Sequence, residues 1–190
     1  PFPVVEGGWE CLLADPAWPF ITWSVKGNRR GPEQHYPTMP VDDICALPVK
    51  EIAADDSVLL LWAVWNRLPD ALRVIDAWGF QYKTLFLTWV KVQLDGGVFQ
   101  GLGYWTRASC EPCLLATRGK ALPRLRKDIS NVLIARPRAH SQKPDGAYDR
   151  IDALFGKEVR RIELFSRRSW PGFERWGLES PEESQLGLEV

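Results

Sequence analysis

Short apolar runs of strand length alternate along the chain with segments whose apolar residues recur at helical spacing. The predicted strands are residues 10–14, 57–64, 82–92, 113–117 and 161–165, with 131–135 as a further short strand. One helix is predicted after Asn66, which can cap it, and another at Pro144, which suits a first helical turn. Strands alternating with helices favour an α/β fold, a sheet with helices on both faces.

Both predicted helices carry an apolar stripe that would face the sheet. The stripes are Leu68, Ala71, Leu72, Ile75 and Trp78 in the first helix, and Tyr148, Ile151, Leu154 and Phe155 in the second. Gly79 is expected to end the first helix. Residues 19–40 and 95–103 lack periodicity and are rich in glycine or proline, which predicts two long loops. Residues 179–190 are acidic and polar, so we expect a single domain over 1–178 and a disordered tail.

The first predicted strand runs directly into Asp15 and Pro16. Proline cannot continue a central strand ladder, so the strand should end there and leave Asp15 at its carboxyl end. Arg167 also follows the end of a predicted strand. In open α/β sheets ligands bind at the carboxyl ends of the strands. We therefore expect Asp15 and Arg167 to share one edge of the sheet, where a site would lie.

The charge is balanced overall but uneven along the chain. Lys+Arg and Asp+Glu both total 24, and 45% of residues are hydrophobic, which excludes a chain disordered by composition. Residues 1–100 carry 8 basic and 12 acidic side chains, whereas residues 118–168 carry 14 basic and 6 acidic ones. The second segment could bind phosphates or form a solvated face. The ten tryptophans could fill the core or stack on bases, and the count does not decide between these.

Four cysteines in 190 residues do not make a secreted disulfide framework. Cys110 and Cys113 have metal-ligand spacing, but only His35 and His140 could complete a zinc site, and neither has the spacing. We therefore expect no metal. The sequence has no signal peptide and no apolar run of membrane length. These features predict a soluble cytoplasmic protein with no membrane contact, associated with the nucleoid if the source is bacterial.

Asp15-Pro16-Ala17-Trp18 suits chemistry on the amino group of adenine, whose lone pair is delocalised into the ring. The Asp15 carboxylate and the Pro16 carbonyl could accept the two amino hydrogens and localise that lone pair. Trp18 offers a face on which the base could stack. A turn that merely ends the strand is the competing interpretation, because Asp-Pro commonly starts turns.

Ten short motifs stand in one order along the chain. They are C-L-L-A-D-P-A-W (11–18), H-Y-P-T-M (35–39), D-I-C-A-L-P-V (43–49), L-L-L-W (59–62), A-W-G-F-Q-Y-K-T (77–84), W-V-K (89–91), G-Y-W-T-R (103–107), C-L-L-A-T-R-G (113–119), H-S-Q-K-P-D (140–145) and I-E-L-F-S-R (162–167). On these motifs, from about residue 9 to residue 179, the chain resembles the MT-A70 family of adenine-N6 methyltransferases, with loops closest to prokaryotic and phage members. The resemblance implies a Rossmann-like methyltransferase fold, with the catalytic motif ahead of the cofactor motif. It also implies S-adenosylmethionine as methyl donor and a nucleic-acid substrate, DNA favoured over RNA.

The resemblance also implies roles for single residues. Asp15, Pro16 and Trp18 fall on the catalytic motif, Tyr36 on a loop residue that closes over the base, and Glu111 on an acid of the base pocket. The expected cofactor contacts are Asp15, Lys143, Glu163, Phe165 and Arg167, with Lys143 between cofactor and target. Lys143 also precedes a predicted helix, whose amino end favours an anionic group beside it.

Basic residues in the predicted loop 19–40 are candidates for holding the nucleic acid. Lys26, Arg29 and Arg30 lead to Tyr36 and could grip a backbone while the base is flipped out. Arg118, Lys120, Arg124, Arg126 and Lys127 could contact phosphates, or the segment could be a solvated loop. His35 and Tyr36 could equally be packing residues of their loop. For Glu163, which stands in an apolar strand, structural pairing and ligand binding both remain open.

The chain departs from the family pattern at two positions. Ala17 stands where the family's motif usually has a second proline, which leaves both acceptors and the aromatic ring in place. Leu178 stands where the family usually has asparagine, and leucine cannot contact a ribose hydroxyl. The alternative to an active enzyme is therefore a non-catalytic nucleic-acid-binding subunit of the same fold. A third hypothesis is an RNA-directed enzyme of the same chemistry. Sequence specificity could come from the loops at 19–40 and 95–103, from the basic segment 118–138 or from another subunit. The chain could form a homodimer or bind a partner subunit.

Overall fold

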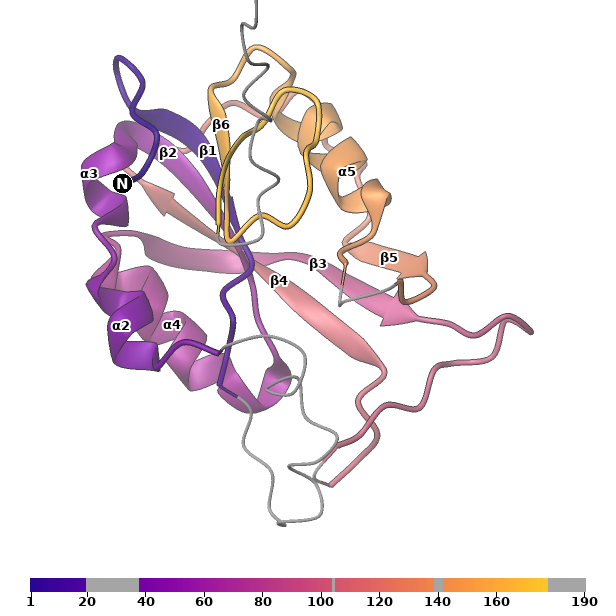
Figure 1. Cartoon of the computed structure of the whole chain (residues 1–190). Helices are drawn as coiled ribbons and strands as arrows, with labels where there is room; N and C mark the ends of the chain where they lie inside the picture. Colours follow the sequence, from indigo (N-terminus) through magenta and orange to yellow (C-terminus); the bar gives the residue numbers. More distant parts are fainter. Residues whose placement is uncertain (20–37, 104, 139–141, 178–190) are drawn as a thin grey trace, which may run out of the picture.

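The structure is a computed structural model that describes residues 1–19, 38–103, 105–138 and 142–177. The strands are β1 (Trp9–Ala14), β2 (Ala53–Trp62), β3 (Gln81–Lys91), β4 (Cys110–Arg118), β5 (Val132–Ala135), β6 (Arg161–Leu164) and β7 (Glu174–Trp176). They form one sheet in the order β5-β3-β4-β2-β1-β6-β7 (Figure 1). β4 runs antiparallel to both of its neighbours, and every other pair is parallel.

Helices cover both faces of this sheet. Side chains alternate between the two faces along each strand, and apolar side chains on both faces pack against helices. The helices are α2 (Val41–Ala46), α3 (Val49–Ile52), α4 (Leu68–Ala77) and α5 (Asp145–Phe155). In β1, Leu12 and Ala14 belong to one core with α2, α3 and α4, while Cys11 and Leu13 belong to a second core with α5. In Figure 1 the two groups of helices lie on opposite sides of β1 and β2. The predicted α/β sheet with helices on both faces is confirmed.

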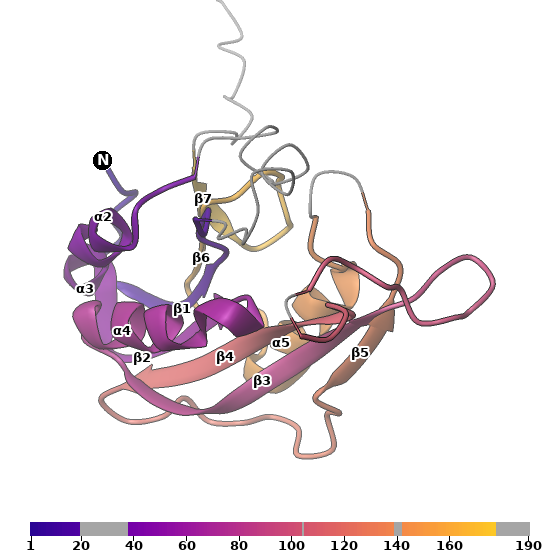
Figure 2. The ribbon, with the colours of Figure 1, turned by 90° about the horizontal axis from the view of Figure 1, so that it is seen from below.

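Several predicted boundaries need correction. β2 begins at Ala53 rather than Ser57, since the exposed Asp55 and Asp56 belong to the strand although aspartate is rare in strands. β4 likewise begins at Cys110, three residues before the predicted start. The loop predicted at residues 95–103 belongs to a longer connection, which begins after β3 ends at Lys91 and ends before β4 begins at Cys110. This connection projects beyond the two strands (Figure 2).

The predicted cap and apolar stripe of α4 are only partly confirmed. Asn66 does not cap α4, because a 3₁₀ turn, η2 (Trp65–Arg67), leads into the helix and Arg67 stands at the N-cap position. Leu72 of the predicted stripe is 39% exposed, and Val74 is buried in its place. Gly79 does end the helix, as predicted, with φ 80° and its N–H donating to the carbonyl of Asp76 at 2.9 Å.

One edge of the sheet brings together parts of the chain that are far apart in sequence. Ala14 at the end of β1 pairs with Leu61 of β2 and with Leu164 of β6, so all three strands end at this edge. Because β4 is antiparallel, its amino end lies at the same edge, where Glu111 pairs with Trp89 of β3. Asp15 and Arg167 therefore follow the ends of adjacent strands, as predicted. We refer to this as the carboxyl edge.

No helix within the described ranges is long and apolar enough to cross a membrane. Among the same residues no group of three or more His, Cys, Asp and Glu could hold a metal ion. Cys110 and Cys113 are free thiols in β4, three positions apart, so their side chains point to opposite faces of the sheet. The Cys110 sulfur accepts a hydrogen bond from the Trp65 indole at 3.3 Å, and Cys113 is buried in the α5 core.

Candidate active site at the carboxyl edge

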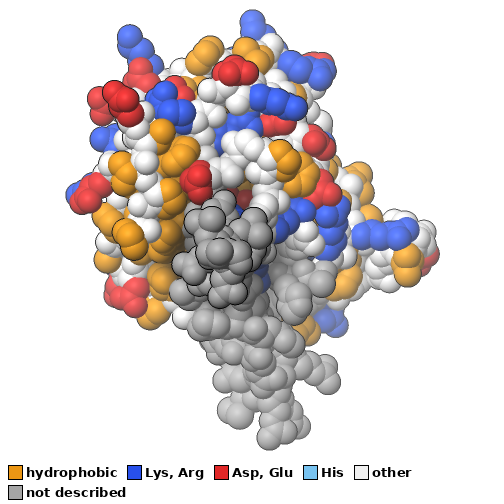
Figure 3. Space-filling view, turned by 45° about the horizontal axis from the view of Figure 1, so that its top comes forward, with side chains coloured by type: hydrophobic (Ala, Val, Ile, Leu, Met, Phe, Trp, Pro, Cys, Tyr) orange, Lys and Arg blue, Asp and Glu red, His pale blue; other side chains and the backbone are white. Residues whose placement is uncertain are grey.

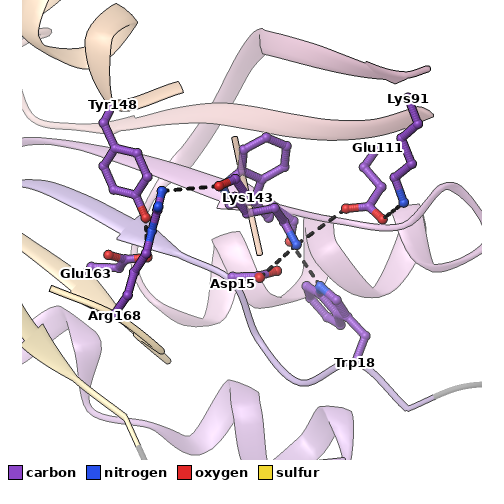
Figure 4. Close-up of polar contacts among 9 residues, drawn as sticks. Asp15, Trp18, Lys91, Glu111, Lys143, Tyr148, Glu163 and Arg168 are labelled. Atoms are coloured by element: carbon purple, nitrogen blue, oxygen red, sulfur yellow. Dashed lines mark hydrogen bonds and ion pairs between the residues drawn. The ribbon is translucent and has the colours of Figure 1, made fainter. Parts of the chain in front are cut away.

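Four side chains of alternating charge form a row at the carboxyl edge (Figure 4). The Lys143 Nζ lies 2.7 Å from the Asp15 Oδ2 and 3.4 Å from the Glu111 Oε2. The other Glu111 oxygen accepts a hydrogen bond from Lys91. This charge row of Asp15, Lys143, Glu111 and Lys91 joins the end of β1, the start of α5, β4 and the end of β3. Asp15 and Lys143, which are neighbours in this row, are 128 residues apart in the chain.

The charge row is held by the backbone geometry around it. The Asp15 N–H points to the Leu164 carbonyl of β6 at 3.4 Å, which continues the parallel pairing by one residue. Lys143 immediately precedes Pro144, the N-cap of α5, and its Nζ lies 5.3 Å from the ring centroid of Trp62 at the end of β2. The lysine amine therefore stands over an aromatic ring with a carboxylate on either side.

Burial makes the electrostatics of this row strong. The Lys143 side chain is only 10% exposed. Burial by itself would lower the pKa of Lys143, but the charges of Asp15 and Glu111 outweigh it and raise that pKa above its ordinary value of 10.5. Burial would likewise raise the pKa of Glu111, but Lys143 and Lys91 hold that pKa below 4.5. The central lysine is therefore an ammonium, and Glu111 is a carboxylate, at neutral pH.

The Pro16 carbonyl, predicted as an acceptor, already accepts one hydrogen bond. The main-chain N–H of Trp18 donates to it at 2.8 Å, which closes a three-residue turn after the strand. A carbonyl oxygen has two lone pairs, so one remains for a further donor. Pro16 itself is buried and Asp15 is partly exposed, so the turn presents the aspartate at the edge.

Trp18 is built into the core beneath this turn. Its indole N–H donates to the Trp62 carbonyl at 3.0 Å, and only 8% of the residue is exposed. The observed contact ties the motif after β1 to the end of β2. The stacking of a base on Trp18 stays a prediction.

A second polar group lies beside the charge row, on the α5 face of the sheet. Glu163 of β6 pairs with Leu13 of β1 and is 7% exposed. Its Oε1 accepts a hydrogen bond from the Tyr148 hydroxyl at 2.8 Å, and its Oε2 has no hydrogen-bond partner among the described residues. Burial raises the pKa of Glu163 to about 7. A buried carboxylate oxygen without a donor is costly to the fold, which points to a ligand as its partner.

The chain turns sharply after β6. Phe165 is the only described non-glycine residue with a positive φ, 62°, a conformation that costs energy and occurs often at ligand sites. The next residue, Ser166, is buried, and its N–H donates to the Trp176 carbonyl of β7 at 3.0 Å. A Cβ at Gly177 would lie 2.7 Å from the Ser166 carbonyl oxygen, so only glycine fits there. Arg167 follows at the same edge, partly buried.

The structure thus brings together Asp15, Pro16, Trp18, Glu111, Lys143, Glu163, Phe165 and Arg167 of the predicted site residues. Lys26, Arg29, Arg30 and Tyr36, together with His35, His140 and Leu178, lie outside the described residues. The described residues on both sides of the segment with Lys26, Arg29, Arg30 and Tyr36 are held beside the turn after β1. The Met39 N–H donates to the Ala17 carbonyl at 2.9 Å, and the Arg67 Nε donates to the Pro19 carbonyl at 3.0 Å.

The predicted phosphate-binding cluster lies elsewhere. Residues 118–127 begin at the carboxyl end of the antiparallel β4, which is the sheet edge opposite the charge row. Arg118 lies 3.8 Å from Asp55, and Arg126 is paired with Asp128 at 2.6 Å. Figure 3 shows basic and acidic side chains interspersed on the face it presents. The solvated loop is therefore the better interpretation of this cluster.

Two contributors were missed by the sequence reasoning. Tyr148 was assigned to the apolar stripe of its helix, and it is buried there, but its hydroxyl binds Glu163. Lys91 was quoted only within a motif, although it is the last residue of β3 and lies one residue before the end of the predicted strand 82–92. The rule that sites lie at the carboxyl ends of strands could have found it, as it found Asp15.

Comparison with known proteins gives the site a family. The MT-A70 family model matches residues 9–179. The type II methyltransferase M.MunI of Mycoplasma sp is 27% identical over an alignment of 190 positions, which covers 92% of this chain and 78% of that protein. An N(6)-adenosine-methyltransferase MT-A70-like protein of Drosophila melanogaster is 31% identical, and the N(6)-adenosine-methyltransferase catalytic subunit METTL3 of Homo sapiens is 28% identical. Each of these alignments covers 86% of this chain but only about a quarter of the eukaryotic protein.

Proposed function

The chain belongs to the MT-A70 family, and from this we propose that it transfers a methyl group from S-adenosylmethionine to the N6 amino group of adenine in nucleic acid, with DNA as the favoured polymer. The observation that carries the proposal is the Asp15–Lys143 pair at the carboxyl edge, beside the unpaired oxygen of Glu163. Coverage supports DNA: the chain spans 78% of a bacterial type II methyltransferase but a quarter of the adenosine methyltransferases. The bacterial relative also supports a cytoplasmic location.

The residues beside β6 fit S-adenosylmethionine. This molecule carries hydrogen-bond donors in its ribose hydroxyls and its ammonium group, and the buried Glu163 Oε2 is an acceptor without a donor in the described part of the chain. We propose that Glu163, Phe165, Arg167, Asp15 and Lys143 hold the cofactor. When bound, it supplies an electrophilic methyl group on a sulfonium.

The residues of the turn after β1 prepare the nucleophile. In this proposal the Asp15 carboxylate and the second lone pair of the Pro16 carbonyl accept the two amino hydrogens of adenine. They would draw the nitrogen toward a tetrahedral shape and localise its lone pair, which would then be available for the methyl group that S-adenosylmethionine would supply. Asp15 is then the nearest base for the proton that the nitrogen must lose. Lys143 holds the Asp15 carboxylate in position. Glu111, on the other side of Lys143, is proposed to line the pocket for the base.

Residues outside the described ranges complete the proposal. Lys26, Arg29 and Arg30 are proposed to hold the nucleic-acid backbone, and Tyr36 to close over the base. The hydrogen bonds at Ala17 and Pro19 support this, since they fix both ends of that segment beside the catalytic turn.

The test is transfer of labelled methyl from S-adenosylmethionine to mixed-sequence DNA and RNA, followed by nucleoside analysis. We expect N6-methyladenine in DNA, in excess over RNA. The reverse ratio would make the protein an RNA enzyme of the same chemistry. Cofactor binding without transfer to either polymer would indicate a required partner subunit or a narrow recognition sequence. Absence of both would favour the non-catalytic nucleic-acid-binding subunit.

Trp18 offers a prediction that separates packing from stacking. Trp18→Ala should weaken substrate binding by ~1–3 kcal/mol through lost stacking. It should also lower the free energy of unfolding by ~3–5 kcal/mol, because the ring is buried. Trp18→Phe keeps an aromatic face and should retain most of the affinity while losing the hydrogen bond to Trp62. Nucleic-acid titrations and urea unfolding measure both effects, and unchanged affinity in the folded alanine variant would remove Trp18 from the base site.

A further inference from the structure

Arg168 contacts the segment that carries Lys143. Its Nη1 lies 2.7 Å from the Asp145 Oδ1, and its Nη2 donates to the Lys143 main-chain carbonyl at 3.2 Å. One guanidinium group thus binds both the residue before Pro144 and the first residue of α5. Figure 4 shows Arg168 between this segment and the Glu163–Tyr148 pair.

We propose that Arg168 is a positioning residue for methyl transfer: by fixing the main chain at Lys143 it sets the lysine amine against the Asp15 carboxylate. The inference rests on the proposed function of the same site. Arg168 itself need not touch the cofactor or the base.

The lysine needs this support because of where it stands. Its side chain is a flexible four-carbon stem, so the position of the amine depends on the backbone from which it starts. Lys143 lies outside any helix or strand, and Pro144, the N-cap residue of α5, makes no side-chain capping hydrogen bond. The Lys143 carbonyl is therefore held by the arginine rather than by a regular ladder or helix.

Arg168 is itself held in place by residues next to the proposed cofactor site. Its guanidinium carbon lies 4.9 Å from the ring centroid of Tyr148 and 5.0 Å from that of Trp170. Its main-chain carbonyl accepts a hydrogen bond from the buried Ser166 hydroxyl at 2.7 Å. The planar fork of arginine can bond two acceptors in different directions at once, which an ammonium group does less rigidly. Because Arg168 is held by the turn after β6 and binds the Lys143 carbonyl, the position of Lys143 depends on the conformation of that turn.

Arg138 provides a matched control. It binds both oxygens of the same Asp145 carboxylate, at 3.0 and 2.7 Å, and no contact in the described structure joins it to Lys143. Arg138→Gln removes an ion pair to Asp145 as Arg168→Gln does, but it leaves the hydrogen bond to the Lys143 carbonyl in place. Any difference between the two variants reports the contact to Lys143.

The experiment compares wild type, Arg168→Gln, Arg168→Lys and Arg138→Gln in two measurements. In methyl transfer at saturating cofactor and DNA, we expect kcat to fall roughly 10²-fold in Arg168→Gln, since displacement of a catalytic group by about 1 Å costs that much. Arg168→Lys should restore only part of the rate, and Arg138→Gln should stay within about threefold of wild type. In NMR spectra of lysine labelled at Cε, with the Lys143 signal assigned through Lys143→Arg, the Trp62 ring near Nζ makes the chemical shift sensitive to the position of the amine. This chemical shift should change in Arg168→Gln and stay unchanged in Arg138→Gln.

The NMR measurement separates this inference from the proposed function. An inactive wild type would contradict the proposed function, while a change of the Lys143 chemical shift specific to Arg168→Gln would still support the positioning role. An active wild type with an unchanged Lys143 chemical shift in Arg168→Gln would overturn the inference. Equal losses in Arg168→Gln and Arg138→Gln would also overturn it, because they would show that the arginine only stabilises Asp145.

Discussion

Replacement of Asp15 by alanine is expected to abolish methyl transfer while the protein stays folded. The variant loses the acceptor that prepares the adenine amino group, and loss of one preorganised polar group at a reacting centre costs ~10²–10³ in rate. Asp15 also receives the proton in the proposed reaction, so the loss should exceed that range. The measurement is the initial rate of labelled methyl transfer, with the product identified as N6-methyladenine.

The ion pair with Lys143 makes the choice of control important. A buried charge that loses every partner costs ~3–5 kcal/mol of stability, but Lys143 keeps Glu111 at 3.4 Å, so we expect a smaller loss in Asp15→Ala. Asp15→Asn keeps the shape and one acceptor, and it should stay nearly as stable yet remain strongly impaired. Asp42→Ala removes an exposed ion pair with Arg73 and should change neither property. Near-normal transfer by folded Asp15→Ala would remove Asp15 from the mechanism.

The sequence predicted this aspartate because its position depends on local rules. Proline ends a strand wherever it would break the ladder, so Asp15 could be placed at the carboxyl edge from three neighbouring residues. Its partner could not be placed in this way. Lys143 is 128 residues away, and the contact depends on the strand order and on the start of α5, neither of which follows from periodicity. The lysine was assigned to the site through family resemblance, and the ion pair itself came only from the structure.

Elements too short to repeat their apolar pattern were missed. α2 has six residues, α3 four and β7 three, so none repeats an apolar pattern long enough to be recognised. Tyr148 illustrates a second limit. Its spacing correctly predicted that it faces the sheet, but a burial pattern gives the face and not the partner of a hydroxyl group. The pair of Tyr148 and Glu163 therefore needed the structure.

Glu163→Gln is expected to change stability and cofactor binding in opposite directions at pH 8. Burial raises the pKa of Glu163 from 4.5 to about 7, so the folded protein binds more protons than the unfolded chain between these values. Stability therefore falls as pH rises through this window, by roughly 2–3 kcal/mol between pH 5 and pH 8. The neutral amide cannot ionise, so the variant should lack this fall. Urea unfolding of both proteins at the two pH values measures the difference, and Glu174→Gln, at an exposed glutamate of β7, is the control.

Cofactor affinity should move the other way, because the amide has one acceptor oxygen where the carboxylate has two. The Tyr148 hydroxyl already uses one oxygen of Glu163, and the unpaired Oε2 is the one proposed to accept a donor from S-adenosylmethionine. Loss of a hydrogen bond to a charged group costs ~1.5–3 kcal/mol, so calorimetry should show affinity reduced about 10- to 100-fold at pH 8. A variant with a flatter pH profile of stability but unchanged affinity would show that Glu163 is only a strained member of the core. A variant with weaker binding and an unchanged profile would instead show that the carboxyl group is not destabilised by burial.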